Sequence, residues 1–183
     1  MAEKLSADKS CLVVIDVQGK LARLMHNKDK LFENIQILIK AFGILDIPVL
    51  WCQQCPDSIG YTVQPIAELL EKKTKPVNKA TFSCCKGGEF VRKLEETSCN
   101  QVLLCGIETH ICIYQTAVEL KEKGKNVTVI ADAVSSRDVE NKNIGIERLK
   151  QEDVKISSTE MAIFEIVGTA EHPDFNRLAK LIK

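Results

Sequence analysis

Hydrophobic residues gather in short runs that are separated by longer amphipathic stretches. The runs are rich in β-branched residues and continuous rather than alternating, which is typical of strands buried on both faces of a parallel sheet. They cover Cys11–Asp16, Ile47–Trp51, Gln101–Cys105, Val127–Ala131 and, more weakly, Val154–Ser157. The pattern therefore predicts five strands spread over the whole chain.

Between these runs, apolar residues recur at helical spacing. The predicted helices are Asp29–Phe42, Thr62–Lys72, Glu89–Glu96, Ile111–Lys123, Asn141–Gln151 and Pro173–Ile182. Strands that alternate with helices, joined by right-handed crossovers, form an α/β domain with helices on both faces of the sheet. Because no Pro/Gly/Ser linker and no repeat divides the chain, we expect residues 1–183 to form a single three-layer α/β/α domain.

The balance of charges limits the partners of the protein. Lys+Arg and Asp+Glu each number 25 among 183 residues, so the chain offers no electrostatic footprint for nucleic acid. A net charge near zero also removes one barrier to self-association. No apolar run is long enough for a bilayer, and the first residues lack a signal-peptide pattern. We therefore expect a cytoplasmic protein without nucleic-acid or membrane partners, whose eight cysteines are mostly reduced.

Polar residues follow several of the predicted strands. In parallel sheets, ligands bind outside the carboxyl ends of the strands, so these residues are the first candidates for chemistry. Asp16 ends the first apolar run, where partial desolvation raises a carboxyl pKa and suits it to proton transfer. A helix-capping role for Asp16 is equally compatible with the sequence.

Cys112 lies just after a predicted strand and near the start of a predicted helix. A helix N-terminus lowers a thiol pKa and points free backbone N–H groups at developing negative charge. Cys112 is therefore a candidate nucleophile, against the alternative of a buried structural cysteine. Lys79 would favour the thiolate and hold Asp16, although for one lysine among many the sequence alone favours a solvated surface residue. His110 is only two residues from Cys112, so we assign it hydrogen bonding rather than base catalysis.

Other sequence signals favour different chemistry only weakly. Cys52 and Cys55 have the spacing of a thiol-disulfide redox motif, but Pro56 and Gly60 indicate a loop where that chemistry needs a helix start. Adjacent Cys84 and Cys85 are awkward ligands for a tetrahedral zinc site. The chain has no dinucleotide-binding glycine pattern after its first strand, no Walker A loop and no Gly-x-Ser-x-Gly elbow.

Five stretches in order resemble one known family. They are Val14–Gln18 (VIDVQ), Lys79–Ser83 (KATFS), Gly106–Cys112 (GIETHIC), Asp132–Arg137 (DAVSSR) and Glu147–Leu149 (ERL). Over nearly its whole length the chain resembles the isochorismatase-like (cysteine hydrolase) family, and within it the isochorismatase domain-containing proteins. The resemblance implies a Rossmann-like, six-stranded parallel sheet in the order 3-2-1-4-5-6.

The resemblance also implies a mechanism. It maps a catalytic triad onto Asp16, Lys79 and Cys112, a cis peptide onto Ile107–Glu108, and an oxyanion hole onto the amides of Glu108 and Cys112. The implied reaction is hydrolysis of a C–N bond in a small amide-type compound, through a thioester on Cys112. The alternative is a catalytically idle protein of the same fold that binds a small molecule or serves as a scaffold.

Differences between this sequence and the motifs of the family restrict the range of expected substrates. Family nicotinamidases carry an Asp-x-His metal site where this chain has Cys52–Cys55 (CQQC), so we expect no metal and no cofactor, and nicotinamide is disfavoured. Family isochorismatases generally lack the cysteine, so retention of Cys112 argues against isochorismate. The expected pocket walls suit a small, fairly neutral substrate and consist of Gln18, Gln53, Gln54, Tyr61, Phe82 and Ile113. The family resemblance further implies a homo-oligomer, a dimer or tetramer.

Overall fold

Six parallel strands form one sheet in the order β3-β2-β1-β4-β5-β6, the order that the family resemblance implies, with one strand more than the apolar pattern predicted. The computed structural model describes residues 4–182, so the ends of the expected 1–183 domain, residues 1–3 and 183, lie outside the described residues. The strands are β1 (Ser10–Ile15), β2 (Val49–Gln54), β3 (Val77–Lys79), β4 (Gln101–Ile107), β5 (Asn126–Ser135) and β6 (Lys155–Ser157).

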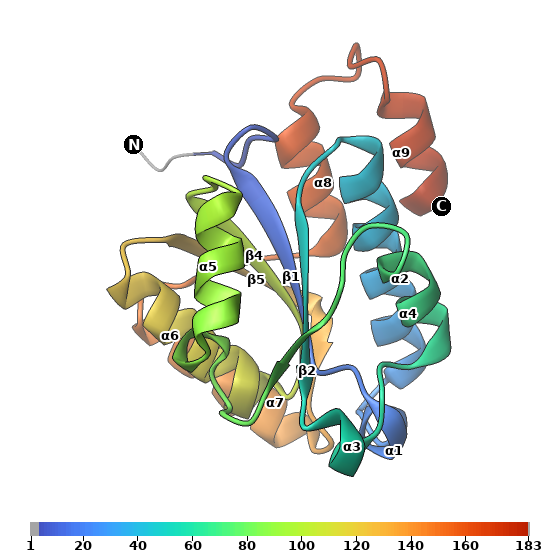
Figure 1. The fold of residues 1–183 in the computed structure, drawn as a ribbon. Coiled ribbons are helices and arrows are strands. Elements are labelled where there is room, and N and C mark those ends of the chain that lie inside the picture. The colour runs from blue at the N-terminus through green and yellow to red at the C-terminus, as the bar shows by residue number, and fades with distance from the viewer. Residues whose placement is uncertain (1–3, 183) are drawn as a thin grey trace.

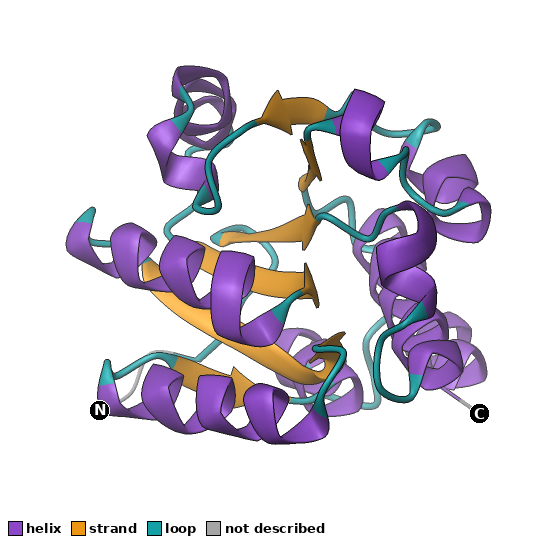
Figure 2. Cartoon of the chain, turned by 90° about the horizontal axis from the view of Figure 1, so that it is seen from below, coloured by secondary structure: helices purple, strands orange, loops and turns teal. Residues whose placement is uncertain are grey.

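Helices cover both faces of the sheet and complete the three layers (Figure 1). One face carries α2 (Lys28–Ile44), α4 (Gln64–Leu70), α8 (Thr159–Val167) and α9 (Phe175–Ile182). The other carries α5 (Gly88–Glu96), α6 (Tyr114–Glu122) and α7 (Val139–Gln151). The view from below shows the strands between these two groups (Figure 2). None of the helices within residues 4–182 is long and apolar enough to cross a membrane.

The central strand β1 explains why its sequence reads as one apolar run. All six of its residues are buried, and their side chains alternate between two cores. Leu12 and Val14 pack under α2, whereas Val13 and Ile15 pack under the opposite layer. Burial on both faces removes the polar positions that an exposed face would require.

Several short elements extend the predicted pattern. Two helices, α1 (Gly19–Arg23) and α3 (Pro56–Ile59), and the 3₁₀ turn η1 (Cys84–Lys86) lie in loops at the carboxyl ends of the strands. The helix predicted over Ile111–Lys123 instead begins as a π-helical turn, η2 (Thr109–Ile113), and continues as α6. These additions all lie near the edge of the sheet where the candidate residues gather.

Gly106 sets the approach of the two central strands at that edge. Its φ is +121°, and a Cβ atom at this position would lie 2.0 Å from the carbonyl oxygen of Ile15. Only glycine combines this backbone conformation with so close a contact. The end of β1, which leads into Asp16, and the end of β4, which leads into η2, are thereby held side by side.

Candidate active site

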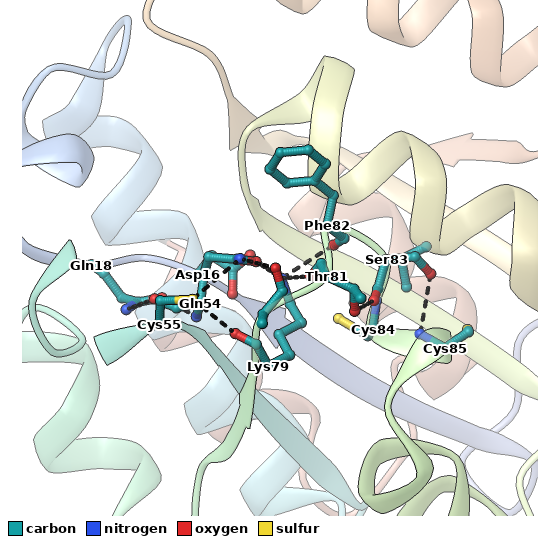
Figure 3. Close-up of polar contacts among 12 residues, drawn as sticks. Asp16, Gln18, Gln54, Cys55, Lys79, Thr81, Phe82, Ser83, Cys84 and Cys85 are labelled. Atoms are coloured by element: carbon teal, nitrogen blue, oxygen red, sulfur yellow. Dashed lines mark hydrogen bonds and ion pairs between the residues drawn. The ribbon is translucent and has the colours of Figure 1, made fainter. Parts of the chain in front are cut away.

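Three neighbouring strands end in polar side chains that meet inside the protein. Asp16 follows β1 in a left-handed conformation with φ of +54°, while Gln54 ends β2 and Lys79 ends β3. The side chains of Lys79 and Asp16 are only 3% and 5% exposed. Figure 3 shows Asp16, Gln54 and Lys79 converging at one point. The sequence prediction that Asp16 and Lys79 are partners therefore matches the observed geometry.

The ammonium group of Lys79 is surrounded by oxygen atoms. Its Nζ lies 2.6 Å from Asp16 Oδ2 and 2.7 Å from Gln54 Oε1, with the carbonyl oxygens of Phe82 and Thr81 at 3.1 and 3.2 Å. Burial alone lowers the pKa of Lys79, but the negative charge of Asp16 and the nearby thiols outweigh it and raise the pKa. Lys79 therefore stays protonated and holds one oxygen of Asp16 in place.

The second oxygen of Asp16 is left available. Oδ1 is buried and has no hydrogen bond of regular geometry to any residue within 4–182. Burial raises the pKa of Asp16, although the charge and hydrogen bond of Lys79 and the thiol of Cys112 oppose the rise. A buried, unpartnered carboxylate oxygen with a raised pKa is suited to accept a proton.

Cys112 faces the same carboxylate but is not a preformed thiolate. Its residue is 7% exposed, and burial raises the pKa of the thiol, a rise that the charge of Asp16 increases and that of Lys79 reduces. We expected the helix N-terminus to lower this pKa. The opposite direction arises because Cys112 is desolvated and lies beside the negative charge of Asp16.

The turn that carries Cys112 is fixed from several sides. The N–H groups of Ile111 and Ile113 donate to the carbonyl of Glu108 at 3.1 and 3.2 Å. His110 Nδ1 is hydrogen-bonded to Ser136 Oγ at 2.9 Å, in keeping with the hydrogen-bonding role assigned to it. The peptide bond between Ile107 and Glu108 is cis, at the position that the family resemblance implies. Such π-helical turns are frequent at functional sites.

Glu108 contributes a side chain that the sequence analysis did not assign. Its carboxylate is 5% exposed and accepts hydrogen bonds from the backbone N–H of Arg137 at 3.0 Å and from its Nε at 3.2 Å. The residue also lines the pocket of Cys112. The sequence signal was present, since an acidic residue inside a stretch of buried residues needs a partner, but the partner lies 29 positions away.

A pocket of about 90 Å³ lies beside Cys112. This volume equals roughly three water molecules, so the pocket fits a small chemical group rather than a bulky one. Its walls are mainly apolar and consist of Asp16, Gln18, Leu21, Gln54, Ile59, Phe82, Ile107, Glu108, Ile111 and Cys112. Leu21, Ile59 and Ile111 were not among the predicted pocket residues. Leu21 and Ile59 lie in the short helices α1 and α3, which give no periodic signal in the sequence.

Three of the predicted pocket residues lie at this pocket. Gln18 is fully buried, and its carboxamide bonds the backbone N–H of Gln54 at 2.6 Å, the carbonyl of Gln54 at 2.9 Å and that of Gly60 at 2.6 Å. Gln54 accepts from Lys79 and donates to the carbonyl of Ala80. Both glutamines therefore organise the wall. Phe82 is 54% exposed and lies at the rim.

The other three predicted pocket residues lie elsewhere, which corrects the prediction. Gln53 points to the opposite face of β2 from Gln54, because successive side chains on a strand alternate, and it lines a separate cavity with Tyr61. Ile113 is fully buried in the core beneath α6 and does not reach the pocket. Gln53 and Ile113 are thus adjacent in sequence to residues that line the pocket, but their own side chains do not line it.

The remaining cysteines are all free thiols. Cys52 is fully buried, and its hydrogen bond with Cys84, together with burial, raises its pKa. This environment disfavours the redox chemistry considered for Cys52 and Cys55, which requires a reactive thiolate. Within residues 4–182, no group of three or more His, Cys, Asp or Glu side chains is arranged to hold a metal ion.

Comparison with known proteins settles the family. The sequence model described as the Isochorismatase domain matches residues 10–161. The chain belongs to the isochorismatase family. It is 35% identical over 98% of its length to the secreted isochorismatase effector Isc1 of Phytophthora sojae, of which the match covers 87%. It is 34% identical over 98% of its length to isochorismatase domain-containing protein 2 of Danio rerio, of which the match covers 89%.

A solved structure agrees with the family assignment. The structure titled MAR1 ribonuclease from Caenorhabditis elegans superposes on 98% of this chain and 92% of its own, with a TM-score of 0.90 and 32% identity. The resemblance to isochorismatase domain-containing proteins and the predicted order of the six strands are therefore confirmed.

Proposed function

We propose that the protein is a cysteine hydrolase that cleaves a C–N bond of a small amide-type compound. Cys112 is the nucleophile, Asp16 is the general base and acid, and Lys79 positions Asp16. The main support for the proposal is that the two carboxylate oxygens of Asp16 have different environments. Oδ2 is bound by Lys79, whereas the buried Oδ1 has no regular hydrogen bond within residues 4–182. A structural ion pair alone would not require the second oxygen to remain unbound next to a thiol.

The proposed reaction begins with a neutral thiol. Asp16 takes the proton of Cys112 as the sulfur attacks the carbonyl carbon, and the electron pair of the C=O bond moves to the oxygen. The amides of Glu108 and Cys112 donate hydrogen bonds to this oxyanion. Donors of this kind, fixed in advance and shielded from water, contribute on the order of 3 kcal/mol each to transition-state stabilisation.

Collapse of the tetrahedral intermediate completes the first half of the reaction. The C–N bond breaks, Asp16 returns its proton to the leaving amine, and a thioester remains on Cys112. Water then loses a proton to Asp16 and attacks the thioester carbon. The carboxylic acid product leaves as the sulfur regains its proton. Lys79 remains charged throughout, because every proton passes through Asp16.

The pocket supports a small substrate. Its volume of about 90 Å³ fits an acyl group of a few heavy atoms, with the rest of the substrate outside the rim at Phe82. Glu108 lines the same pocket, and we propose that its carboxylate accepts a hydrogen bond from an N–H group of the substrate. These features favour primary or small secondary amides over esters, which carry no N–H donor.

The test is turnover of a panel of small carboxamides, measured as released ammonia or amine. Since the C. elegans protein is titled a ribonuclease, an RNA oligonucleotide is included in the panel. We expect release from at least one carboxamide by the parent, and none by Cys112→Ala or Asp16→Asn. Release that persists in Cys112→Ala, or cleavage of RNA alone, would refute the proposal.

Cys85 provides the matched control. It is 8% exposed, against 7% for Cys112, and burial raises its pKa to about 12. It does not border the pocket of Asp16. Turnover should therefore survive Cys85→Ala, so that a loss in Cys112→Ala reports the nucleophile and not the removal of a buried thiol. A protein that turns over none of the panel would match the alternative of a catalytically idle binding protein.

A further inference from the structure

A second and larger cavity lies on the other side of β2. Its volume is about 600 Å³, within the range typical of small-molecule sites. Trp51 and Gln53 from β2 and Thr62 from the segment before α4 form its buried part. Gln53 and Gln54 are adjacent, but Gln54 faces the pocket of Cys112 and Gln53 faces this cavity. The two sites are thus separated by a single strand.

The carboxamide of Gln53 opens into this cavity and has no partner within residues 4–182. The residue is 2% exposed, and no side chain or backbone group in that range hydrogen-bonds its carboxamide, whose polar atoms are not sealed off from the cavity. Three other buried glutamines, Gln18, Gln54 and Gln101, all have their carboxamides engaged. A carboxamide that faces open space without a protein partner has both its donor and its acceptor available to a group from outside the chain.

The residues that line the cavity beside Gln53 indicate the chemical groups that a bound compound would carry. Asn78 on β3 pairs in register with Gln53 and lines the same cavity, so two carboxamides stand side by side on one face of the sheet. Trp51, two residues before Gln53, adds an apolar surface, and its indole N–H is already used by Thr62 Oγ1 at 2.9 Å. Glu71 and Lys75 at the exposed rim carry opposite charges, so the cavity has no strong preference for an ion.

We propose that this cavity is a second binding site, which takes a small neutral compound bearing an amide or lactam group. The N–H and C=O of such a group pair with the complementary acceptor and donor of the Gln53 carboxamide. The apolar part of the compound packs on Trp51. The site is distinct from the pocket of Cys112 and does not depend on the proposed hydrolysis.

Trp51 is the single tryptophan of the chain, so its fluorescence reports directly on this cavity. The probe is δ-valerolactam, which is transparent where tryptophan is excited, and N-methyl-δ-valerolactam is the analogue without the N–H donor. We expect a saturable change of Trp51 emission with δ-valerolactam, unchanged in Cys112→Ala. The N-methyl analogue should bind more weakly by on the order of tenfold or more, the effect of losing one hydrogen bond to a buried group.

Variants separate Gln53 from general effects on the fold. Gln53→Leu should weaken δ-valerolactam binding by on the order of tenfold or more, and it should remain folded because no hydrogen bond of the side chain within residues 4–182 is lost. Gln64→Leu is the matched control, since Gln64 borders the same cavity but is bonded to Glu68 at 2.7 Å. No saturable change in the parent, or equal binding in Gln53→Leu and the parent, would overturn the proposal.

Discussion

The ammonium of Lys79 lies 2.6 Å from the carboxylate of Asp16, although the two residues are 63 positions apart in sequence. Both side chains are at most 5% exposed, so each charge is almost completely removed from water. Loss of one partner from such a pair leaves the other as an uncompensated buried charge, which is far more costly than loss of a surface pair.

Replacing Lys79 with methionine should therefore destabilise the fold. We expect Lys79→Met to lower the free energy of unfolding by about 3–5 kcal/mol near neutral pH, measured by urea denaturation. Burial already raises the pKa of Asp16, and loss of Lys79 raises it further. A carboxyl with a raised pKa in the folded state costs stability as the pH rises through that pKa. The deficit should thus shrink toward acid pH.

Two controls distinguish this effect from a loss of packing. The double variant Asp16→Asn/Lys79→Met should be more stable than Lys79→Met alone, because no buried charge remains. Lys93→Met removes a partly exposed pair with Glu89 at 3.4 Å and should cost less than about 1 kcal/mol. Equal deficits at every pH, with no recovery in the double variant, would show that the ion pair is not the cause.

Alkylation should reveal a thiol that is protonated at rest. Because burial and Asp16 raise the pKa of Cys112, its rate of labelling by iodoacetamide should be low near neutral pH and still rise above pH 9.0, the ordinary thiol pKa. Asp16→Asn removes a charge that raises this pKa and leaves Lys79 in place, so the apparent pKa should fall. The variant should thus be labelled faster than the parent at about pH 8 while it loses turnover.

Cys85 serves as an internal reference in the same spectra. Its pKa is raised to about 12, and Asp16 is not among the groups that affect it. Its labelling should be the same in the parent and in Asp16→Asn. Rapid labelling of Cys112 that does not change between acid and neutral pH would contradict the neutral-thiol mechanism.

Gly145 on α7 should control the position of the catalytic turn. A Cβ atom there would lie 3.0 Å from the backbone nitrogen of His110 and 3.1 Å from Thr109 Cγ2. Gly145→Ala should displace η2 and lower kcat by on the order of tenfold, because catalysis is sensitive to shifts of a fraction of an ångström. Gly88, a helical glycine with open space around it, is the control. Equal kcat values in Gly145→Ala and Gly88→Ala would show that the contact is irrelevant.

Glu108 should determine the preference for substrates with an N–H group. Glu108→Gln keeps an oxygen for the backbone N–H of Arg137 but removes the negative charge of a residue that lines the pocket. We expect kcat/KM for amides to fall by on the order of tenfold relative to matched esters, the loss of one charge-assisted hydrogen bond. If both substrate classes fall equally, Glu108 supports the turn and does not select the substrate.

The fold was readable from the sequence where packing imposes a pattern. Strands such as β1 are buried on both faces, so their apolar runs are continuous. β3 has only three residues, with Asn78 exposed between two buried neighbours, and no apolar run marks it. α8 was not predicted, although its buried residues recur at helical spacing; they are Thr159, Ala162, Ile163 and Val167. The exposed Met161 is also apolar, which obscures the difference between the two faces of this helix.

Only part of the candidate site could be predicted from the sequence, because strands give a regular pattern and loops do not. Asp16, Lys79 and Cys112 follow strands, and parallel strands bring their carboxyl ends to one edge. The pocket walls depend on which way each side chain points in a loop. A one-residue difference separates Gln53 from Gln54 and places them on opposite faces of the sheet. The cytoplasmic location, the homo-oligomer and the substrate remain predictions, since they depend on more than the fold of one chain.

The most direct test of the account is to trap the thioester. The parent is mixed with p-nitrophenyl acetate, quenched in acid within the first turnover, digested and analysed by mass spectrometry. We expect a hydroxylamine-labile acetyl group on the peptide that contains Cys112, and no such adduct in Cys112→Ala. Acetylation spread evenly over the cysteines, or absent from Cys112, would contradict Cys112 as the nucleophile.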